Sequence, residues 1–273
     1  MTASIDRDNP IKPILARKAY AEPSVFTPQG LLREARRQKS IPQGAVPSVC
    51  LLDPDGDLTR HLQAQRARRN PHWACYHTEM LELETAAGTL GVVGCAVGAP
   101  FAVLIAEQLF ASGCRLLISI TSAGQLVPAG EPPYFVLIDH ALRDEGTSYH
   151  YLPASAYSSI SPEMAALGRS LLHDTTDIVQ GSAWTTDAPF RETAAAIAFA
   201  KSQGLLAVEM EASALYAFAT AKARPVICFA HVTNRMATVA NDFEKGEADG
   251  NQAMVALINR IVHRWKRGDE ASQ

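Results

Sequence analysis

The sequence lacks several features that mark specialised classes of protein. It has no basic excess, since 25 Lys and Arg residues stand against 28 Asp and Glu residues and give a formal net charge of -3. A protein that mainly binds nucleic acid usually carries a strong basic excess, so we expect no nucleic-acid partner. The five cysteines are odd in number and form no C-x-x-C pair. This argues against a disulfide framework and favours reduced thiols and a cytoplasmic location.

Uninterrupted apolar segments are also scarce. Residues 1–13 carry charges and prolines and contain no apolar stretch of the kind found in a secretory signal. Residues 85–106 contain no charge and are long enough to span a bilayer. However, four glycines and Pro100 interrupt this segment, which is typical of a strand, a turn and the start of a helix. We therefore expect no membrane span.

The composition nevertheless supports a large folded core. Hydrophobic residues make up 47% of the 273 residues and charged residues 19%. From Val49 onward, short apolar runs alternate with helical patterns, which predicts an α/β fold with a largely covered sheet. Such folds bind their ligands at strand ends. We expect strands at 48–52, 88–97, 115–120, 133–139 and 225–232, and helices at 101–112, 162–173, 192–202, 211–222 and 251–266.

The first 47 residues differ from the rest of the chain. They contain six prolines and one short Arg-rich helical candidate at 30–39. We interpret residues 1–47 as an N-terminal arm that wraps the domain or contacts a neighbouring subunit. Residues 48–268 are expected to form a single domain, and residues 269–273 a short tail.

Three local patterns suggest chemistry but have simpler explanations. The glycines of 91–98 do not have G-x-G-x-x-G spacing, so a tight strand-to-helix turn is favoured over a dinucleotide site. The His and Cys residues of 72–77 lack a second pair of ligands, so we expect no metal. The basic run of 60–69 is expected to be a solvated helix face.

Two carboxylates stand where an apolar strand meets a helix. Glu209 and Glu211 occupy this junction, and burying them without partners would be costly. One explanation is that Glu211 caps the helix, because acidic residues are favoured in a first turn. The other is that the pair serves a binding site.

The sequence around these residues favours the binding site. Residues 207–216, AVEMEASALY, resemble the V-E-M-E-A-x-A signature of the nucleoside phosphorylase and nucleosidase family. Residues 118–125 resemble its I-x-x-G-T/S-x-G segment, 186–190 its S-x-D-x-F-Y base-site loop, and 232–235 the end of its late strand. The order and spacing agree from about Val49 to the C-terminal helix. The resemblance implies a three-layer αβα domain with a central mixed sheet, no organic cofactor or metal, and a homo-oligomer (dimer or hexamer).

The resemblance also implies cleavage of the N-glycosidic bond of a nucleoside. Glu211 would hold the 2′-hydroxyl while the sugar becomes oxocarbenium-like, and Met210 would pack on the sugar. Asn234 takes the place of the group that stabilises the departing base; its amide can hydrogen-bond a base nitrogen but is no general acid. Which base is cleaved stays open. The remaining substrate-binding candidates are Glu209, Thr121, Ser122, Gly124, Trp184, Phe190, Arg191, Thr233 and Arg235.

The chain departs from the family at its phosphate site. Phosphorylases of the family have a Gly-Asp-Pro-x-Arg loop after the first strand and an Arg before the G-T/S-x-G segment. Here residues 52–57 read LDPDGD, and Ser119 takes the second Arg position. Carboxylates in this loop would repel a phosphate, which requires N–H groups and cations. We therefore expect water as the nucleophile, with Asp55 or Asp57 as general base. The alternatives are a phosphorylase with a relocated phosphate site and a catalytically weak nucleoside-binding protein.

Overall fold

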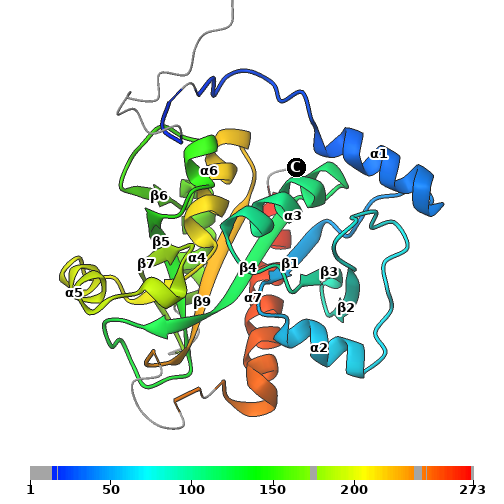
Figure 1. The fold of residues 1–273 in the computed structure, drawn as a ribbon. Coiled ribbons are helices and arrows are strands. Elements are labelled where there is room, and N and C mark those ends of the chain that lie inside the picture. Colours follow the sequence, from blue (N-terminus) through cyan, green and yellow to red (C-terminus); the bar gives the residue numbers. More distant parts are fainter. Residues whose placement is uncertain (1–13, 17, 173–176, 237–241, 244, 272–273) are drawn as a thin grey trace, which may run out of the picture.

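The computed structural model describes residues 14–16, 18–172, 177–236, 242–243 and 245–271 (Figure 1). Its strands are β1 (Val49–Asp53), β2 (Leu81–Thr85), β3 (Gly88–Gly94), β4 (Leu116–Gln125), β5 (Tyr134–Asp144), β6 (Tyr157–Ser159), β7 (Ile178–Thr186), β8 (Ala207–Glu209) and β9 (Val226–Asn234). Its α-helices are α1 (Pro28–Lys39), α2 (Asp57–Ala64), α3 (Ala99–Ala111), α4 (Pro162–Leu172), α5 (Ala194–Ser202), α6 (Ala212–Lys222) and α7 (Asn251–Ala271).

The strands form one mixed sheet. Its order is β2-β3-β1-β4-β8-β7-β5-β6, and β9 pairs in parallel with β4 and antiparallel with β5. Because β9 links β4 to β5, the strands β4, β8, β7, β5 and β9 close into a ring. Strands β1, β3 and β2 extend from β4 as an open wing. The loop after β1 therefore lies beside the point where β4 enters the ring.

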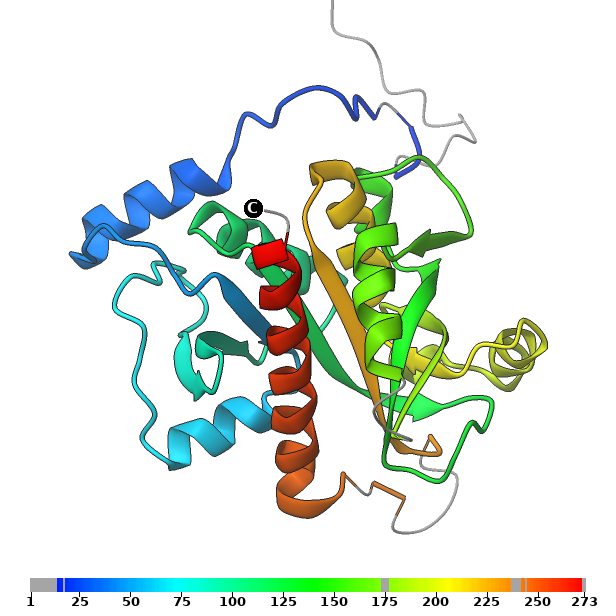
Figure 2. The same ribbon diagram turned by 180° about the vertical axis from the view of Figure 1, so that it is seen from behind.

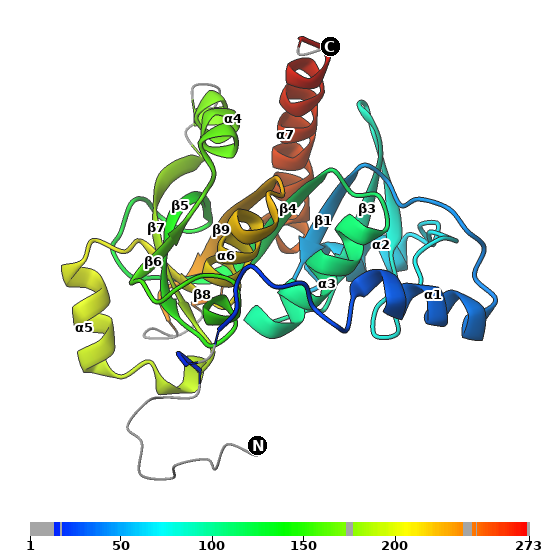
Figure 3. The same cartoon turned by 90° about the horizontal axis from the view of Figure 1, so that it is seen from above.

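Helices cover both faces of this sheet, and the apolar core is divided accordingly. Helices α3 and α6 lie on one face, with α1 outside α3, while α2, α4 and α7 lie on the other (Figures 1 and 2). One cluster of buried side chains joins the sheet to α3 and α6, and another joins it to α2, α4 and α7. Figure 3 shows the sheet between these layers, seen from above. The predicted αβα arrangement with a mixed sheet is confirmed.

Most expected elements are present, and the differences have local causes. Pro100 stands in the first turn of α3, and Gly113, with φ of +108°, follows its end, as helix-start and helix-stop residues should. The strand expected at 115–120 continues to Gln125, because β9 pairs with β4 as far as Gly124. Strand β7 was not expected, since its sequence IVQGSAWTT mixes polar and small residues with apolar ones.

The described part of the N-terminal arm packs against the domain of the same chain. Helix α1 packs on α3, and the preceding segment meets the 146–151 loop through Lys18, whose Nζ lies 2.8 Å from His150 Nδ1. Between the arm and helices α3 and α6 lies a cavity of about 820 Å³. None of the helices in the described ranges has the length and apolar character needed to cross a membrane.

Candidate active site

The loop after β1 brings Asp55 against β4. Leu52 of β1 pairs with Ser119 of β4, and the two strands run parallel. Three residues further along each chain, Asp55 reaches Ser122. Asp55 Oδ2 accepts a hydrogen bond of 2.6 Å from the backbone N–H of Ser122 and one of 3.3 Å from the Thr121 hydroxyl. No hydrogen bond from a described residue reaches the other oxygen, Oδ1.

Asp53 and Thr59 hold this loop in shape. Asp53 Oδ2 accepts hydrogen bonds of 2.8 Å from the Thr59 N–H and 2.9 Å from its hydroxyl, in the first turn of α2. The neighbouring strand β3 must leave room for Thr59, because a Cβ at Gly94 would lie 2.0 Å from Thr59 Oγ1. Burial raises the pKa of Asp53 to about 6. Asp53 thus organises the loop rather than facing a ligand.

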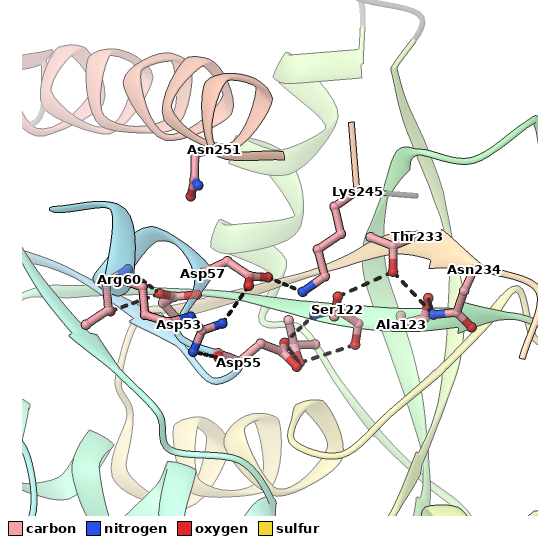
Figure 4. Close-up of polar contacts among 12 residues, drawn as sticks. Asp53, Asp55, Asp57, Arg60, Ser122, Ala123, Thr233, Asn234, Lys245 and Asn251 are labelled. Atoms are coloured by element: carbon pink, nitrogen blue, oxygen red, sulfur yellow. Dashed lines mark hydrogen bonds and ion pairs between the residues drawn. The ribbon is translucent and has the colours of Figure 1, made fainter. Parts of the chain in front are cut away.

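Asp57 is paired with two cations (Figure 4). Its Oδ1 lies 2.7 Å from Arg60 Nη2, and its Oδ2 lies 2.5 Å from Lys245 Nζ. Arg60 also donates a hydrogen bond of 2.9 Å to the backbone carbonyl of Asp55. Both oxygens of Asp57 are therefore engaged, whereas Oδ1 of Asp55 accepts no hydrogen bond from a described residue. This distinguishes the two candidate bases that the sequence left as equals.

Glu211 lies directly before α6 and is 1% exposed. Its Oε1 accepts a hydrogen bond of 2.7 Å from the Gly98 N–H. Gly98 adopts a φ of +93° to present this N–H ahead of α3, a conformation that favours glycine. The second oxygen, Oε2, is buried and has no hydrogen-bond partner in the described part of the chain. A buried carboxylate oxygen without a partner is unfavourable, and it marks a position where a ligand hydroxyl could bind.

The surroundings of Glu211 keep its proton tightly bound. Burial, and next the charge of Glu209, raise the pKa of Glu211 to about 8. The Gly98 N–H and the Thr121 hydroxyl act in the opposite direction, and the charge of Asp55 raises the pKa further. Thr121 therefore lies near both carboxylates, Asp55 and Glu211.

Glu209, and not Glu211, caps the helix. Its Oε2 accepts hydrogen bonds of 2.7 Å from the N–H groups of Glu211 and Ala212, and its Oε1 accepts one from the Thr185 hydroxyl. Glu211 makes no side-chain cap bond, so the capping explanation for Glu211 is wrong. Burial raises the pKa of Glu209 to about 7. Glu209 therefore has its hydrogen-bond partners within the chain, whereas Oε2 of Glu211 has none among the described residues.

Asn234 ends β9 on the same side of the sheet (Figure 4). Its Nδ2 donates hydrogen bonds of 3.4 Å to the Ala123 carbonyl and 3.2 Å to the Thr233 hydroxyl, and its Oδ1 accepts one of 2.8 Å from the Met236 N–H. The Thr233 hydroxyl also lies 3.4 Å from the Ser122 hydroxyl. A chain of polar contacts therefore runs from Asn234 to the strand that binds Asp55.

Gly124 is required by close packing at this point. A Cβ on Gly124 would lie 2.9 Å from Met236 Cγ and 3.4 Å from Asn234 Oδ1. The register between β4 and β9 also shifts here. Met210 stands between Glu209 and Glu211 and is partly buried.

The four other candidates have different surroundings. Trp184 is 4% exposed within a small apolar cluster, and its indole N–H donates a hydrogen bond of 3.0 Å to Asp144 Oδ2. Phe190 is 99% exposed and Arg191 is exposed beside it. Arg235 is exposed and forms an ion pair with Glu131. The structure therefore gathers the carboxylates and hydroxyls, whereas Trp184 is buried in an apolar cluster and Phe190, Arg191 and Arg235 are exposed.

Two contributors were not identified from the sequence. Lys245 stands in a polar segment without a periodic pattern, and nothing local signals its contact with a residue 188 positions away. Gly98 belongs to a glycine series that was interpreted as a turn, and its N–H bond to Glu211 depends on the tertiary fold. Within the described ranges, no group of three His, Cys, Asp or Glu side chains is arranged to hold a metal ion.

Comparison with known protein families identifies the family of the chain. The model of the phosphorylase superfamily matches residues 44–263, so the protein belongs to the phosphorylase superfamily. The predictions of the family and of an enzyme are confirmed. None of the curated proteins compared with the sequence matches it.

Several solved structures share the fold. Uridine phosphorylase from Vibrio fischeri ES114 superposes with a TM-score of 0.68 at 18% identity, over 81% of this chain and 92% of that one. AMP nucleosidase from Bacteroides thetaiotaomicron VPI-5482 gives a TM-score of 0.65 at 18% identity, over 89% and 100%. A futalosine hydrolase mutant from Helicobacter pylori strain 26695 gives 0.63 at 13%, over 80% and 99%. By name, these relatives include both a phosphorylase and hydrolytic enzymes.

Proposed function

We propose that the protein cleaves the N-glycosidic bond of a nucleoside or related N-ribosyl compound, with water rather than phosphate as the nucleophile. One observation carries the proposal: Asp55 Oδ2 accepts the hydrogen bonds of the Ser122 N–H and the Thr121 hydroxyl. These donors belong to the segment that resembles the G-T/S-x-G segment of the family. A carboxylate of the chain itself thus uses groups that an incoming phosphate would need.

Asp55 is the general base in this proposal. Its Oδ1 is open among the described residues, while both oxygens of Asp57 are engaged by Arg60 and Lys245. Asp55 Oδ1 takes a proton from water, the water oxygen forms a bond to C1′ of the sugar, and the C1′–N bond breaks with its electron pair leaving on the base. The base leaves as an anion and takes up a proton from solvent, Asp55 releases its proton to solvent, and the products are the free sugar and the free base.

Glu211 stabilises the positive character that develops on the sugar. Its unpartnered Oε2 is the acceptor for the 2′-hydroxyl, and an ionised carboxylate strengthens this hydrogen bond as the ring becomes oxocarbenium-like. Glycoside hydrolysis usually requires two carboxyl groups with different roles. Here one would activate the water and the other would stabilise the sugar. Met210 packs on the sugar, and Asn234 supplies a hydrogen bond rather than a proton to the base.

A phosphorylase with a relocated phosphate site is the second candidate. The observation in its favour is the presence of two cations, Arg60 and Lys245, beside the loop. Both already pair with Asp57, so phosphate would have to displace a carboxylate to use them. The same carboxylates make a hydrolase the better-supported candidate.

The experiment begins with a panel of nucleosides and nucleotides in phosphate-free buffer. The panel includes uridine, AMP and futalosine, and liberated base is quantified by chromatography. Asp55→Asn, which preserves shape but removes the proton acceptor, should lower the rate by about 100-fold or more. Asp57→Asn should cost about 10-fold, since Asp57 does not contact the water. Equal rates for Asp55→Asn and the wild type would exclude Asp55 as the base.

We also propose a cytoplasmic homo-oligomer, a dimer or hexamer, in which residues 1–47 lie next to a neighbouring subunit. Family resemblance and the arm's position beside α3 support this. Light scattering of the full chain and of a chain lacking residues 1–47 tests it. A full-length protein that is monomeric at the concentrations used for activity would contradict it.

A further inference from the structure

The segment before α7 returns to the loop after β1. Lys245 opens the described segment 245–250, which turns tightly through positive φ values at Gly246, Ala248, Asp249 and Gly250. From there Lys245 Nζ reaches Asp57 Oδ2 at 2.5 Å, across 188 residues (Figure 4). One side chain therefore joins the approach to the last helix with the loop that carries Asp55.

This ion pair differs from the exposed pairs of the protein. The side chains of Lys245 and Asp57 are 26% and 13% exposed, whereas those of Arg69 and Glu79 are 70% and 51% exposed. Exposed pairs contribute little because water screens them. A partly buried pair is screened less, and it fixes the geometry of the groups that it joins.

Asp57 is held from two sides. Arg60 binds Oδ1 from the next turn of α2, a local contact between residues three apart. Lys245 binds Oδ2 from outside that helix. Without Lys245, the side chain of Asp57 would keep only the contact with Arg60 among the described residues. The start of α2 would then lose its ion pair with the segment before α7.

We propose that Lys245 is a positioning residue of the hydrolytic site: by binding Asp57, it holds the loop after β1 so that Asp55 faces the attacking water. This inference rests on the proposed function. Lys245 touches neither water nor sugar in this account and acts through Asp57. Its charge also lies close enough to influence Asp55.

The charges around Asp55 give Lys245 a second effect. Burial raises the pKa of Asp55, the Ser122 N–H and then Lys245 lower it, and Asp57 raises it. Removing Lys245 should therefore move the pKa of Asp55 upward. Among the described residues, the other charged or titratable groups facing this loop are Asp53, Glu211, the Arg60 guanidinium, Cys95, whose Sγ would lie 2.5 Å from a Cβ on Gly56, and His231, which faces Lys245 and Asp57. Burial lowers the pKa of His231 to about 4, so it is uncharged at neutral pH.

The test compares Lys245→Met, Lys245→Arg and the matched control Arg69→Met, which removes an exposed pair. Base release is measured for each variant, and circular dichroism and thermal unfolding report folding. The Asp carboxyl carbons are titrated by ¹³C NMR, with the Asp55 signal assigned from the spectrum of Asp55→Asn. The NMR titration needs no substrate, so it stays decisive whichever nucleophile the enzyme uses.

We expect Lys245→Met to fold and to lose between about 10- and 100-fold in kcat, with KM within about twofold, as for a misplaced catalytic group. The Asp55 titration should move to higher pH. Lys245→Arg should have a kcat and an Asp55 titration close to those of the wild type. Arg69→Met should match the wild type in both. Unchanged kcat, or a loss of kcat without movement of the Asp55 titration, overturns the proposal.

Two results separate this inference from the proposed function. If the wild type needs phosphate and releases ribose 1-phosphate, the hydrolytic function fails, whatever Lys245 does. If the wild type cleaves its substrate in water but Lys245→Met leaves the Asp55 titration in place, only the role of Lys245 fails.

Discussion

The backbone N–H of Ser122 donates a hydrogen bond of 2.6 Å to the carboxylate of Asp55, which lies 67 residues earlier in the chain. This contact follows from the parallel register of β1 and β4, in which Leu52 pairs with Ser119. The strand that presents a hydroxyl and an N–H therefore meets a carboxylate of its own chain. In the proposed function, this carboxylate is the general base, and the groups that bind it are not free to bind an anion.

Glu211→Gln should remove most of the activity. The amide keeps the size of the side chain but cannot bind the 2′-hydroxyl with a full negative charge. We expect kcat/KM to fall by about 100- to 1,000-fold, the usual loss when a group that stabilises a developing charge is removed. Steady-state rates of base release measure this. A variant with more than about a tenth of the wild-type kcat/KM would contradict the role assigned to Glu211.

The pH dependence of activity should reflect the protonation of Glu211. Burial raises the pKa of this residue to about 8, and only the ionised form accepts the hydrogen bond in the proposed mechanism. In the wild type, kcat/KM should therefore rise with pH and level off above about pH 8. A profile of kcat/KM between pH 5 and 9.5 tests this. A profile that is already flat at pH 6 is incompatible with a protonated Glu211 in the free enzyme.

Stability should change with pH in the opposite direction. The raised pKa values of Asp53, Glu209 and Glu211, about 6, 7 and 8, mean that the folded state holds protons which the unfolded chain has released. The contribution of these three groups to the free energy of unfolding is therefore highest below the ordinary carboxyl pKa values. It falls as the pH rises through these three folded values. Urea unfolding of the wild type at pH 5 and pH 9 measures the difference.

Glu211→Gln should reduce this loss of stability, because it removes one of the three buried acids. Between pH 5 and pH 9, we expect the free energy of unfolding of the variant to fall by about 1–3 kcal/mol less than that of the wild type. Glu79→Gln, at an exposed side chain, is the control and should show the pH dependence of the wild type. Parallel pH dependences for Glu211→Gln and the wild type would mean that Glu211 is ionised throughout.

Gly94→Ala should disturb the loop after β1, although Gly94 itself lies in the neighbouring strand β3. A Cβ at this position would lie 2.0 Å from Thr59 Oγ1, the hydroxyl that donates to Asp53. We expect a loss of about 1–3 kcal/mol in the free energy of unfolding, as for other overpacked core positions, together with lower activity. Gly130→Ala is the matched control, since its Cβ would meet Tyr134 Cδ1 at an ordinary 3.8 Å. Equal stability of the two variants would contradict this packing argument.

Much of the fold could be predicted from local patterns. Pro100 and Gly113 mark the ends of α3 because their backbone preferences are independent of the rest of the chain. Strand β7 was missed because its place beside β5 and β8 is set by pairing with residues distant in sequence. Strand β4 was predicted too short for the same reason, as β9 supplies the partner for its second half.

Short motifs predicted many of the residues that form the candidate site, but not how their contacts are divided. The junction around residues 207–216 identified two acids, but not which of them would cap the helix. That division depends on Thr185, which occupies one oxygen of Glu209, and on Gly98, which binds one oxygen of Glu211. Likewise, Asp55 and Asp57 are equivalent in the sequence. They differ in the structure because Lys245 reaches only Asp57.

The most direct measurement is the dependence of the reaction on phosphate. Once a substrate is known, wild-type enzyme is dialysed free of phosphate, and base release is followed with and without added phosphate while the sugar product is identified by NMR. We predict the same rate in both conditions and free ribose, or the corresponding free sugar, as the product. A strict requirement for phosphate, with the sugar 1-phosphate as product, would contradict the assignment of Asp55 as the base that activates water.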